Sequence, residues 1–224
     1  LPKLEAAQLP RILSGVYGTG DKLPTEAELG DDFGISRITV RQALGLLRDE
    51  GLVTSGGSRR AGTLTLPRNT DGAGSEAGVR AVAARDIVDI IEFRSVVEPA
   101  VARLAARRSD ETLVARLRAA VESLGGAPDP TSFRRADSEF HLALAQACGN
   151  ERLMEAVLVT RAELLHWRDL IPMPDDIEEN RAEHERITAA VTDHDEEAAA
   201  AAMLDHLRLT LASFQAHIHV TGDS

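Results

Sequence analysis

The apolar positions follow a helical period along most of the chain, with one interruption near the front. Apolar residues spaced three and four apart predict helices over residues 4–15, 25–34 and 36–51. Two runs of strand character, "LVT" and "TLTL", flank the segment "SGGSRRAG" and predict a β-hairpin. In the third helix we expect one buried side, made of Ile38, Val40, Ala43, Leu44 and Leu47.

After a stretch rich in Gly, Ser and acidic residues, which has the composition of a flexible linker, the helical period resumes without a strand-like run. Breakers such as "GGAPDP", "CGN" and "PMP" separate the helices predicted there, which cover residues 81–97, 99–108, 110–124, 131–148, 150–170, 175–193 and 195–219. We therefore predict a mainly α protein, with a small N-terminal domain (1–66), a linker (67–79) and an all-α bundle of six or seven helices (80–219).

Charge is distributed unevenly between the two parts. The net charge of −11 would by itself argue against a nucleic-acid partner. Residues 1–68 carry nine Lys or Arg against eight Asp or Glu, so the excess of acid lies in the second part. Within residues 36–68, six arginines stand against only two acids. Backbone phosphates respond to such a local basic patch whatever the total charge, so the front domain remains a candidate for DNA binding.

The cellular compartment is indicated by what the chain lacks. Cys148 is the only cysteine, which excludes an intramolecular disulfide and fits a reducing cytoplasm. No apolar run is long enough to cross a bilayer, and no charged-then-apolar leader stands at the start. We therefore expect a cytoplasmic protein with no membrane partner.

The two short helices joined by "FGIS" fit a helix-turn-helix, in which the second helix enters the major groove of DNA. Its first turns and the tip of the hairpin carry side chains suited to base edges and phosphates: Ser36, Arg37, Thr39, Arg41, Arg59 and Arg60. The alternative is that these arginines form only a solvated helix face. Their combination in this order favours DNA binding.

The stretch "LPTEAELGDDFGISRITVRQALGLLRDEGLV", with its glycine-containing wing and "GT", resembles the winged helix-turn-helix of GntR-type bacterial transcription regulators. The resemblance covers about residues 9–66 and implies a DNA-binding domain. There are departures from the family pattern. Ala27 stands where the family sometimes has a DNA-contacting arginine, and the wing is longer and richer in arginine. The resemblance therefore does not define the operator sequence.

In the second part, "DSEFHLALA" places Asp137 and His141 four positions apart on one helix face, within an apolar stripe. Burying an acid and an imidazole is costly without a partner, and a local hydrogen bond in the core is one explanation. His184 and His206 also lie on apolar stripes and should face inward. One carboxylate and three imidazoles from three helices form a ligand set for a divalent transition metal. We expect zinc, with nickel, manganese and iron as alternatives.

The other four histidines are weaker candidates for metal ligands. His194 lies in the charged segment "TDHDEE" and His219 in the tail. His166 is at a helix end before "PMP", and His217 falls on the inward stripe but late in its helix.

This order of ligands resembles the effector domain of the FadR-like subfamily of the same regulators, known as the FCD domain. The resemblance spans about residues 80–215 and rests on "EFRSVVEPAVARLAA", "DSEFHLALAQACGNERL", "EHERITAAV" and "AMLDHL". It implies an effector-binding and dimerisation domain with a divalent metal. Members that lack these ligands bind apolar effectors without a metal, whereas this chain has all four ligands.

The metal would be structural if four protein ligands closed a tetrahedral zinc site. An octahedral ion would keep positions open for a small carboxylate effector, which we expect to be a hydroxy or dicarboxylic acid. Arg94 would point into such a pocket and bind an acidic group of the effector through its guanidinium. The alternative is that Arg94 forms an i,i+4 ion pair with Glu98. Asn150 is an effector-binding candidate on the resemblance alone, and a cap of the next helix is its alternative.

Three functions are compatible with these features. The first, which we favour, is a metabolite-responsive regulator, acting as a repressor, that binds a palindromic operator as a homodimer and is released by its effector. The second is a constitutive DNA-binding dimer with a structural metal. The third is a helical metalloenzyme, but the chain has no HExxH or comparable spacing to supply a general base. We therefore predict that the protein is not an enzyme.

Overall fold

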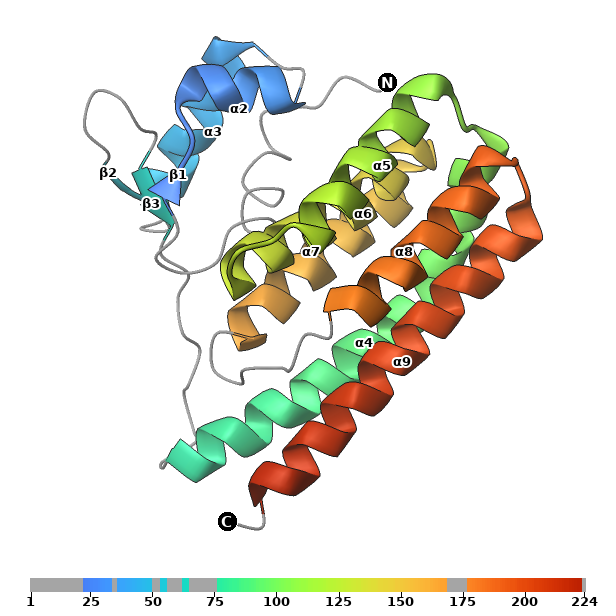
Figure 1. Cartoon of the computed structure of the whole chain (residues 1–224). Helices are drawn as coiled ribbons and strands as arrows, with labels where there is room; N and C mark the ends of the chain where they lie inside the picture. Colours follow the sequence, from blue (N-terminus) through green and yellow to red (C-terminus); the bar gives the residue numbers. More distant parts are fainter. Residues whose placement is uncertain are drawn as a thin grey trace.

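The computed structural model describes residues 22–33, 36–49, 53–55, 62–64, 76–168 and 177–222. Figure 1 shows a small unit at the front of the chain and a larger helical bundle behind it in sequence. The small unit contains β1 (Lys22–Leu23), α2 (Glu26–Phe33), α3 (Arg37–Asp49), β2 (Val53–Ser55) and β3 (Gly62–Leu64). The mainly α fold class predicted from the sequence is confirmed.

The start of α2 is fixed by a reciprocal cap. The Thr25 amide donates to Oε2 of Glu28 at 2.7 Å, and the Glu28 amide donates to the Thr25 hydroxyl at 3.2 Å. This capping box satisfies two amides that the first turn of a helix leaves without a partner. In α3, the carbonyl of Ser36 accepts a hydrogen bond from the amide of Val40 at 3.0 Å, so the helix begins where the sequence predicted.

The expected buried side of α3 is correct except at its start. Val40, Leu44 and Leu47 are fully buried, whereas Ile38 is 69% exposed. The prediction for Ile38 was wrong because it lies two positions before Val40, which places it about 200° around the helix from that residue. Ala43 has a side chain outside the described residues.

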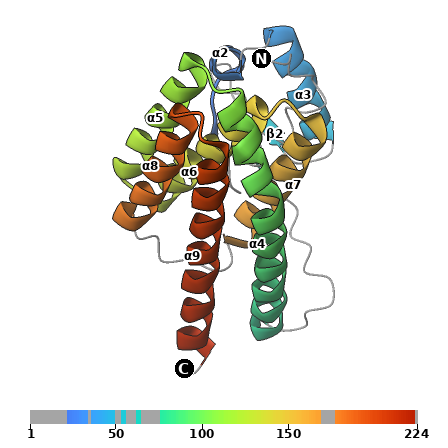
Figure 2. The same ribbon diagram turned by 90° about the vertical axis from the view of Figure 1, so that its right-hand side faces the viewer.

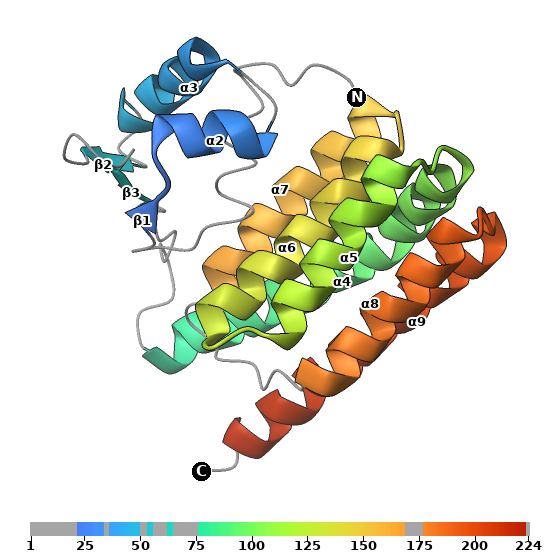
Figure 3. The ribbon, with the colours of Figure 1, turned by 45° about the horizontal axis from the view of Figure 1, so that its top comes forward.

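The three strands form one antiparallel sheet in the order β1-β3-β2. In the predicted hairpin, Val53 pairs with Leu64 and Ser55 pairs with Gly62. The strand β1 was not predicted, because two residues are too few to show an alternating pattern; its Lys22 pairs with Thr63. The wing strands are thereby held beside the helix pair, as Figure 3 shows.

The bundle consists of six helices in the described part of the chain: α4 (Glu76–Arg107), α5 (Glu111–Gly125), α6 (Pro130–Ala147), α7 (Glu151–Arg168), α8 (Ile177–Thr192) and α9 (Glu196–Gly222). The helices α5, α6 and α7 lie side by side as one layer (Figure 3). The long helices α4 and α9 run antiparallel to each other along their length (Figure 2). None of the described helices is both long and apolar enough to cross a membrane.

Two boundary predictions differ from the structure around α4. The helices expected over 81–97 and 99–108 are one helix with Pro99 inside it. A proline removes one backbone hydrogen bond, but the buried Ile91, Val101 and Ala105 hold both halves against neighbouring helices. The helix also begins at Glu76, so the last four residues of the expected linker, 76–79, are helical.

The breaks before α5, α6, α7 and α9 carry side-chain caps. The side chains of Asp110, Asp129 and Asn150 accept hydrogen bonds from amides in the first turns of α5, α6 and α7. Asp195 accepts in the same way from Ala198 in the first turn of α9. These caps explain why "GGAPDP" and "CGN" end one helix and start the next.

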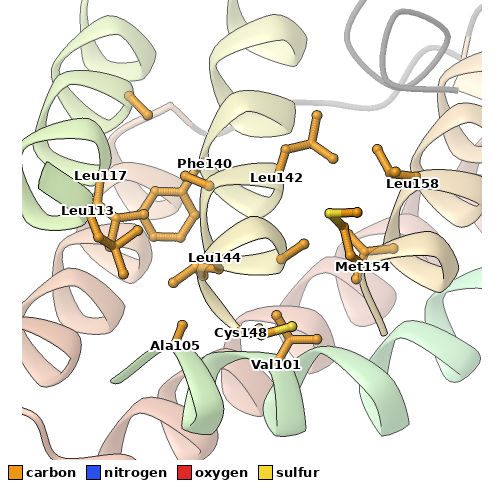
Figure 4. Packing of buried hydrophobic residues seen from close by; sticks show 14 of the residues in the cluster. Val101, Ala105, Leu113, Leu117, Phe140, Leu142, Leu144, Cys148, Met154 and Leu158 are labelled. Carbon is orange, nitrogen blue, oxygen red and sulfur yellow. The ribbon is translucent and has the colours of Figure 1, made fainter. Parts of the chain in front are cut away.

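The central position of α6 determines where a functional site can form. Its apolar residues Phe140, Leu144 and Cys148 are fully buried. They contact side chains of α4, α5 and α7, which Figure 4 shows on three sides of α6: Val101, Ala105, Leu113, Leu117, Met154 and Leu158. Polar side chains on the same helix are therefore enclosed by neighbouring helices.

Candidate metal centre

Four polar side chains from three helices meet inside the bundle. Asp137 and His141 come from α6, His184 from α8 and His206 from α9. All four are buried, and one ligand atom from each lies within 4.8 Å of all the others. The structure therefore brings together the set that the sequence singled out. Such a cluster of one carboxylate and three imidazoles has the size and donor types of a divalent-metal site.

Each histidine ring is oriented through its Nδ1 atom. Nδ1 lies 2.5 Å from Oε2 of Glu98 in His141, and 2.6 Å from Oε2 of Glu183 in His206. In His184 it lies 2.8 Å from the backbone carbonyl of Asn180. Because these partners are acceptors, each Nδ1 is the donor, and the Nε2 atom carries the lone pair. This is the tautomer that a metal ligand needs.

Two of the three Nε2 atoms are unpaired in the described part of the structure. Those of His141 and His184 are buried and have no hydrogen-bond partner there. They lie 3.6 Å and 3.3 Å from Oδ1 of Asp137. Unpaired buried nitrogen atoms aimed at a carboxylate oxygen are costly unless a ligand joins them. The residues therefore fit a metal ion.

The electrostatics keep the donors in their ligating forms. Burial would raise the pKa of Asp137, but the charge of Arg161, with the nearby rings of His141 and His184, holds it well below its usual value. Burial lowers the pKa of His184, and burial with the nearby His184 and His141 lowers that of His206 further. An ionised carboxylate and neutral imidazoles are the forms that bind metal.

The two carboxyl groups that bond His141 and His206 have pKa values shifted in opposite directions. Burial would raise the pKa of Glu98, but Arg94 and His141 outweigh it and the pKa is lowered. For Glu183, burial and the charge of Glu179 raise the pKa to about 7. The two carboxylates that orient histidines thus have different surroundings, although both are buried.

Arg94 and Asn150, the two effector-binding candidates, have different positions. The Nε atom of Arg94 donates to Oε1 of Glu98 at 2.6 Å, so the ion pair left open by the sequence is formed. Its Nη2 atom is buried without a partner among the described residues. Asn150 is exposed and caps α7 through the amides of Arg152 and Leu153, as its alternative proposed.

The DNA-binding candidates lie on the outside of α3, where they are described. Ser36, Arg37 and Arg41 are exposed, and Arg41 is one turn after Arg37. Oε2 of Glu26 accepts from Nε and Nη2 of Arg41 at 3.1 and 2.8 Å, which links α3 to α2. The side chain of Thr39, and all of Arg59 and Arg60, lie outside the described residues.

Comparisons with known proteins agree with this division. A family model described as "Bacterial regulatory proteins, gntR family" matches residues 6–63, and the FCD domain matches residues 89–209, more than half of the chain. The chain belongs to the GntR family. It is a transcription regulator with an N-terminal helix-turn-helix and a C-terminal FCD domain, and not an enzyme.

Three relatives illustrate this membership. The transcriptional regulator LutR of Bacillus subtilis is 31% identical to this chain, over 88% of this chain and 92% of LutR. The galactonate operon transcriptional repressor of Escherichia coli is 29% identical, over 84% of the chain and 87% of the repressor. The solved structure of Streptococcus agalactiae GntR is 25% identical, covers 92% of this chain and 97% of that one, and superposes with a TM-score of 0.50.

Two polar residues of this FCD domain were missed by sequence reasoning, although a signal was present. Glu183 directly precedes His184 in the sequence, and it is buried beside His206. Arg161 lies on the stripe of Val157 and Leu164, at helical spacing, so a charged residue there had to be buried. The weaker candidate His194 is exposed, and its Nδ1 lies 3.1 Å from the carbonyl of Ala106. The side chains of His166, His217 and His219 lie outside the described residues.

Proposed function

We propose that this GntR regulator is a metabolite-responsive repressor whose FCD domain binds one divalent metal ion and a small carboxylate effector. The observation that carries the proposal is the cluster of four ligand atoms within 4.8 Å of one another. Asp137, His141, His184 and His206 would hold the ion. A bound ion would supply a positive centre for an anionic ligand. Zinc is the first expectation, with nickel, manganese and iron as alternatives.

The effector is expected to be a hydroxy or dicarboxylic acid. Nη2 of the buried Arg94 has no partner among the described residues and would donate to an acidic group of the effector. The name of the Escherichia coli relative refers to galactonate, a hydroxy acid, which supports this chemical class. Asn150 is not retained as a main contact, because its side-chain oxygen caps α7.

The DNA-binding part of the proposal concerns the exposed start of α3. Ser36, Arg37, Thr39 and Arg41 would contact the major groove, and Arg59 and Arg60 the adjacent backbone or minor groove. A palindromic operator read by two such helices requires a homodimer, acting in the cytoplasm. To act as a switch, the effector must prefer one arrangement of the two domains, since equal affinity for both would change nothing. We expect effector binding to move the two recognition helices of the dimer away from the ~34 Å spacing of one DNA turn. The dimer would then release the operator.

The test combines metal analysis with calorimetry. Protein purified without chelators is expected to contain one divalent ion per chain, and organic acids are then titrated into the metal-loaded form and into an Arg94→Ala variant. We expect acid binding to need the metal and to be lost with Arg94→Ala. The matched control is Arg135→Ala, because Arg135 makes the same i,i+4 bond to a glutamate, Glu139, at the surface.

Two outcomes would reject parts of this proposal. A chain that holds metal but binds none of the acids, and whose DNA affinity no acid changes, would instead be a constitutive DNA-binding dimer with a structural metal. A chain that cannot be loaded with metal at all would remove the proposed FCD site, while leaving its family membership intact.

A further inference from the structure

Two buried arginines are joined by hydrogen bonds to residues of the histidine cluster or to their partners. Arg94, on α4, is 2% exposed and Arg161, on α7, is 1% exposed. Arg94 bonds Glu98, which bonds His141. Nη2 of Arg161 donates to Oδ2 of Asp137, whose Oδ1 faces the histidines, and to the hydroxyl of Ser138 at 2.8 Å.

Each guanidinium has a donor that nothing in the described structure uses. These donors are Nη2 of Arg94 and Nε of Arg161, and both atoms are buried. A shared anion would satisfy both donors and would lie beside two positive charges.

The charge balance of the site changes sign when a metal is added. The buried charged side chains in the described residues are Arg94, Arg161, Glu98, Asp137 and Glu183. Without a metal, the two arginines are matched by Glu98 and Asp137. A divalent ion adds two positive charges, and Glu183 can offset at most one of them. The loaded site therefore carries at least one unbalanced positive charge away from water, which favours an anionic ligand.

We propose that Arg161 is a second effector-binding residue of this site, with two simultaneous roles. Through Nη2 it positions Asp137 for the metal, and through Nε it donates to the carboxylate of a small organic acid that Arg94 also contacts. This inference rests on the proposed function. It explains why a full guanidinium is buried on α7: its donors lie on three nitrogens in a fixed plane, whereas a lysine carries its donors on one rotating nitrogen.

The two roles are separated with Arg161→Lys. An ammonium can still pair with Asp137, so this variant is expected to keep one metal per chain, with its metal affinity measured by competition with a chelating dye. Its affinity for malate and gluconate, measured by calorimetry on the metal-loaded protein, is expected to fall at least tenfold. The control is Ser138→Ala, which removes one acceptor of Arg161 but keeps the guanidinium, and should bind both acids within about threefold of wild type.

A second measurement covers the case in which the lysine variant loses its metal or does not fold. In metal-loaded wild-type protein with ¹⁵N-labelled arginine, the Nε–H signal of Arg161 is expected to shift when malate is added. The signal is assigned by its absence in Arg161→Gln. A signal unmoved at saturating malate, or a lysine variant that binds both acids like wild type, overturns the role of Arg161. If wild-type protein binds metal but neither these nor other acids, the effector proposal itself fails, and this inference with it.

Discussion

Two arginines of α3 and two arginines of the bundle have opposite surroundings. Arg37 and Arg41 are exposed on α3, where Arg41 pairs with Glu26, whereas Arg94 and Arg161 are almost inaccessible and pair with the buried Glu98 and Asp137. An exposed guanidinium remains largely hydrated, and the free energy with which it binds a large anionic partner depends on the salt concentration. A buried one is costly unless its partners are in place beforehand. The same side chain is thus suited to a macromolecule in one region and to a small ligand in the other.

The largest expected effect is on metal content, in the buried region. His184→Ala removes one of four ligands, and we expect metal, measured by elemental analysis, to fall from about one ion per chain to near zero. His194→Ala changes an exposed histidine outside the cluster and should leave it unchanged. The His184→Ala variant should also lose the increase in melting temperature that metal gives to wild-type protein. Undiminished metal in that variant would contradict the assignment of the ligands.

The second effect concerns the exposed region. Arg37→Ala is expected to weaken operator binding by about 1–3 kcal/mol and, if Arg37 contacts a base, to relax the sequence preference. Fluorescence anisotropy at fixed salt measures this. Arg152→Ala, an exposed arginine of the bundle whose side chain is 92% accessible, serves as the control and should not change affinity. Equal affinity for all three proteins would exclude this helix face from DNA contact.

The third prediction compares Gly149 in the bundle with Gly45 in α3, by the effect of replacing each with alanine on the free energy of unfolding. Gly149, between α6 and α7, has φ +65°, and a Cβ there would lie 3.1 Å from Nε of Arg108. Gly149→Ala should therefore lower the free energy of unfolding by about 1–2 kcal/mol. Gly45, inside α3, has open space around it, and Gly45→Ala should raise the free energy by about 0.5–1 kcal/mol. Urea denaturation compares them, and effects of the same sign would contradict this reading.

The smallest expected effect is that of Ile38→Ala. Because Ile38 is 69% exposed, the change in unfolding free energy should stay within about 0.5 kcal/mol. Leu44→Ala, on the buried side of the same helix, should cost about 2–5 kcal/mol. A large destabilisation by Ile38→Ala would restore the expectation that it belongs to the core.

The sequence predicted the cluster of Asp137 and three histidines well because helical spacing is a local property. Asp137 and His141 share a face by their four-residue separation, and His184 and His206 each lie on an apolar stripe, so their inward orientation followed without knowledge of the fold. The hydrogen-bond partners that come from other helices were harder to predict from the sequence. That Arg161 reaches Asp137, and that Glu183 reaches His206, depends on how α7 and α9 pack against their neighbours, which spacing does not encode.

The boundary errors have a similar origin. Pro99 is a reasonable helix break when only α4 is considered, but tertiary packing on both sides of it keeps the helix continuous. The strand β1 has too few residues for a pattern and forms because β3 offers it backbone partners. In each case a contact distant in sequence overrides a local preference.

The order of the ligands along the chain has a consequence for how the molecule matures. Asp137 and His141 come first, then His184, and His206 follows on α9. A ribosome makes the chain from its N-terminus, so the winged domain and the earlier bundle helices emerge while the proposed metal site still lacks its last imidazole. The site can close only when α9 docks between α4 and α8. On the proposed function, uptake of the ion would need the completed chain, whereas the DNA-binding part can form before the four side chains meet.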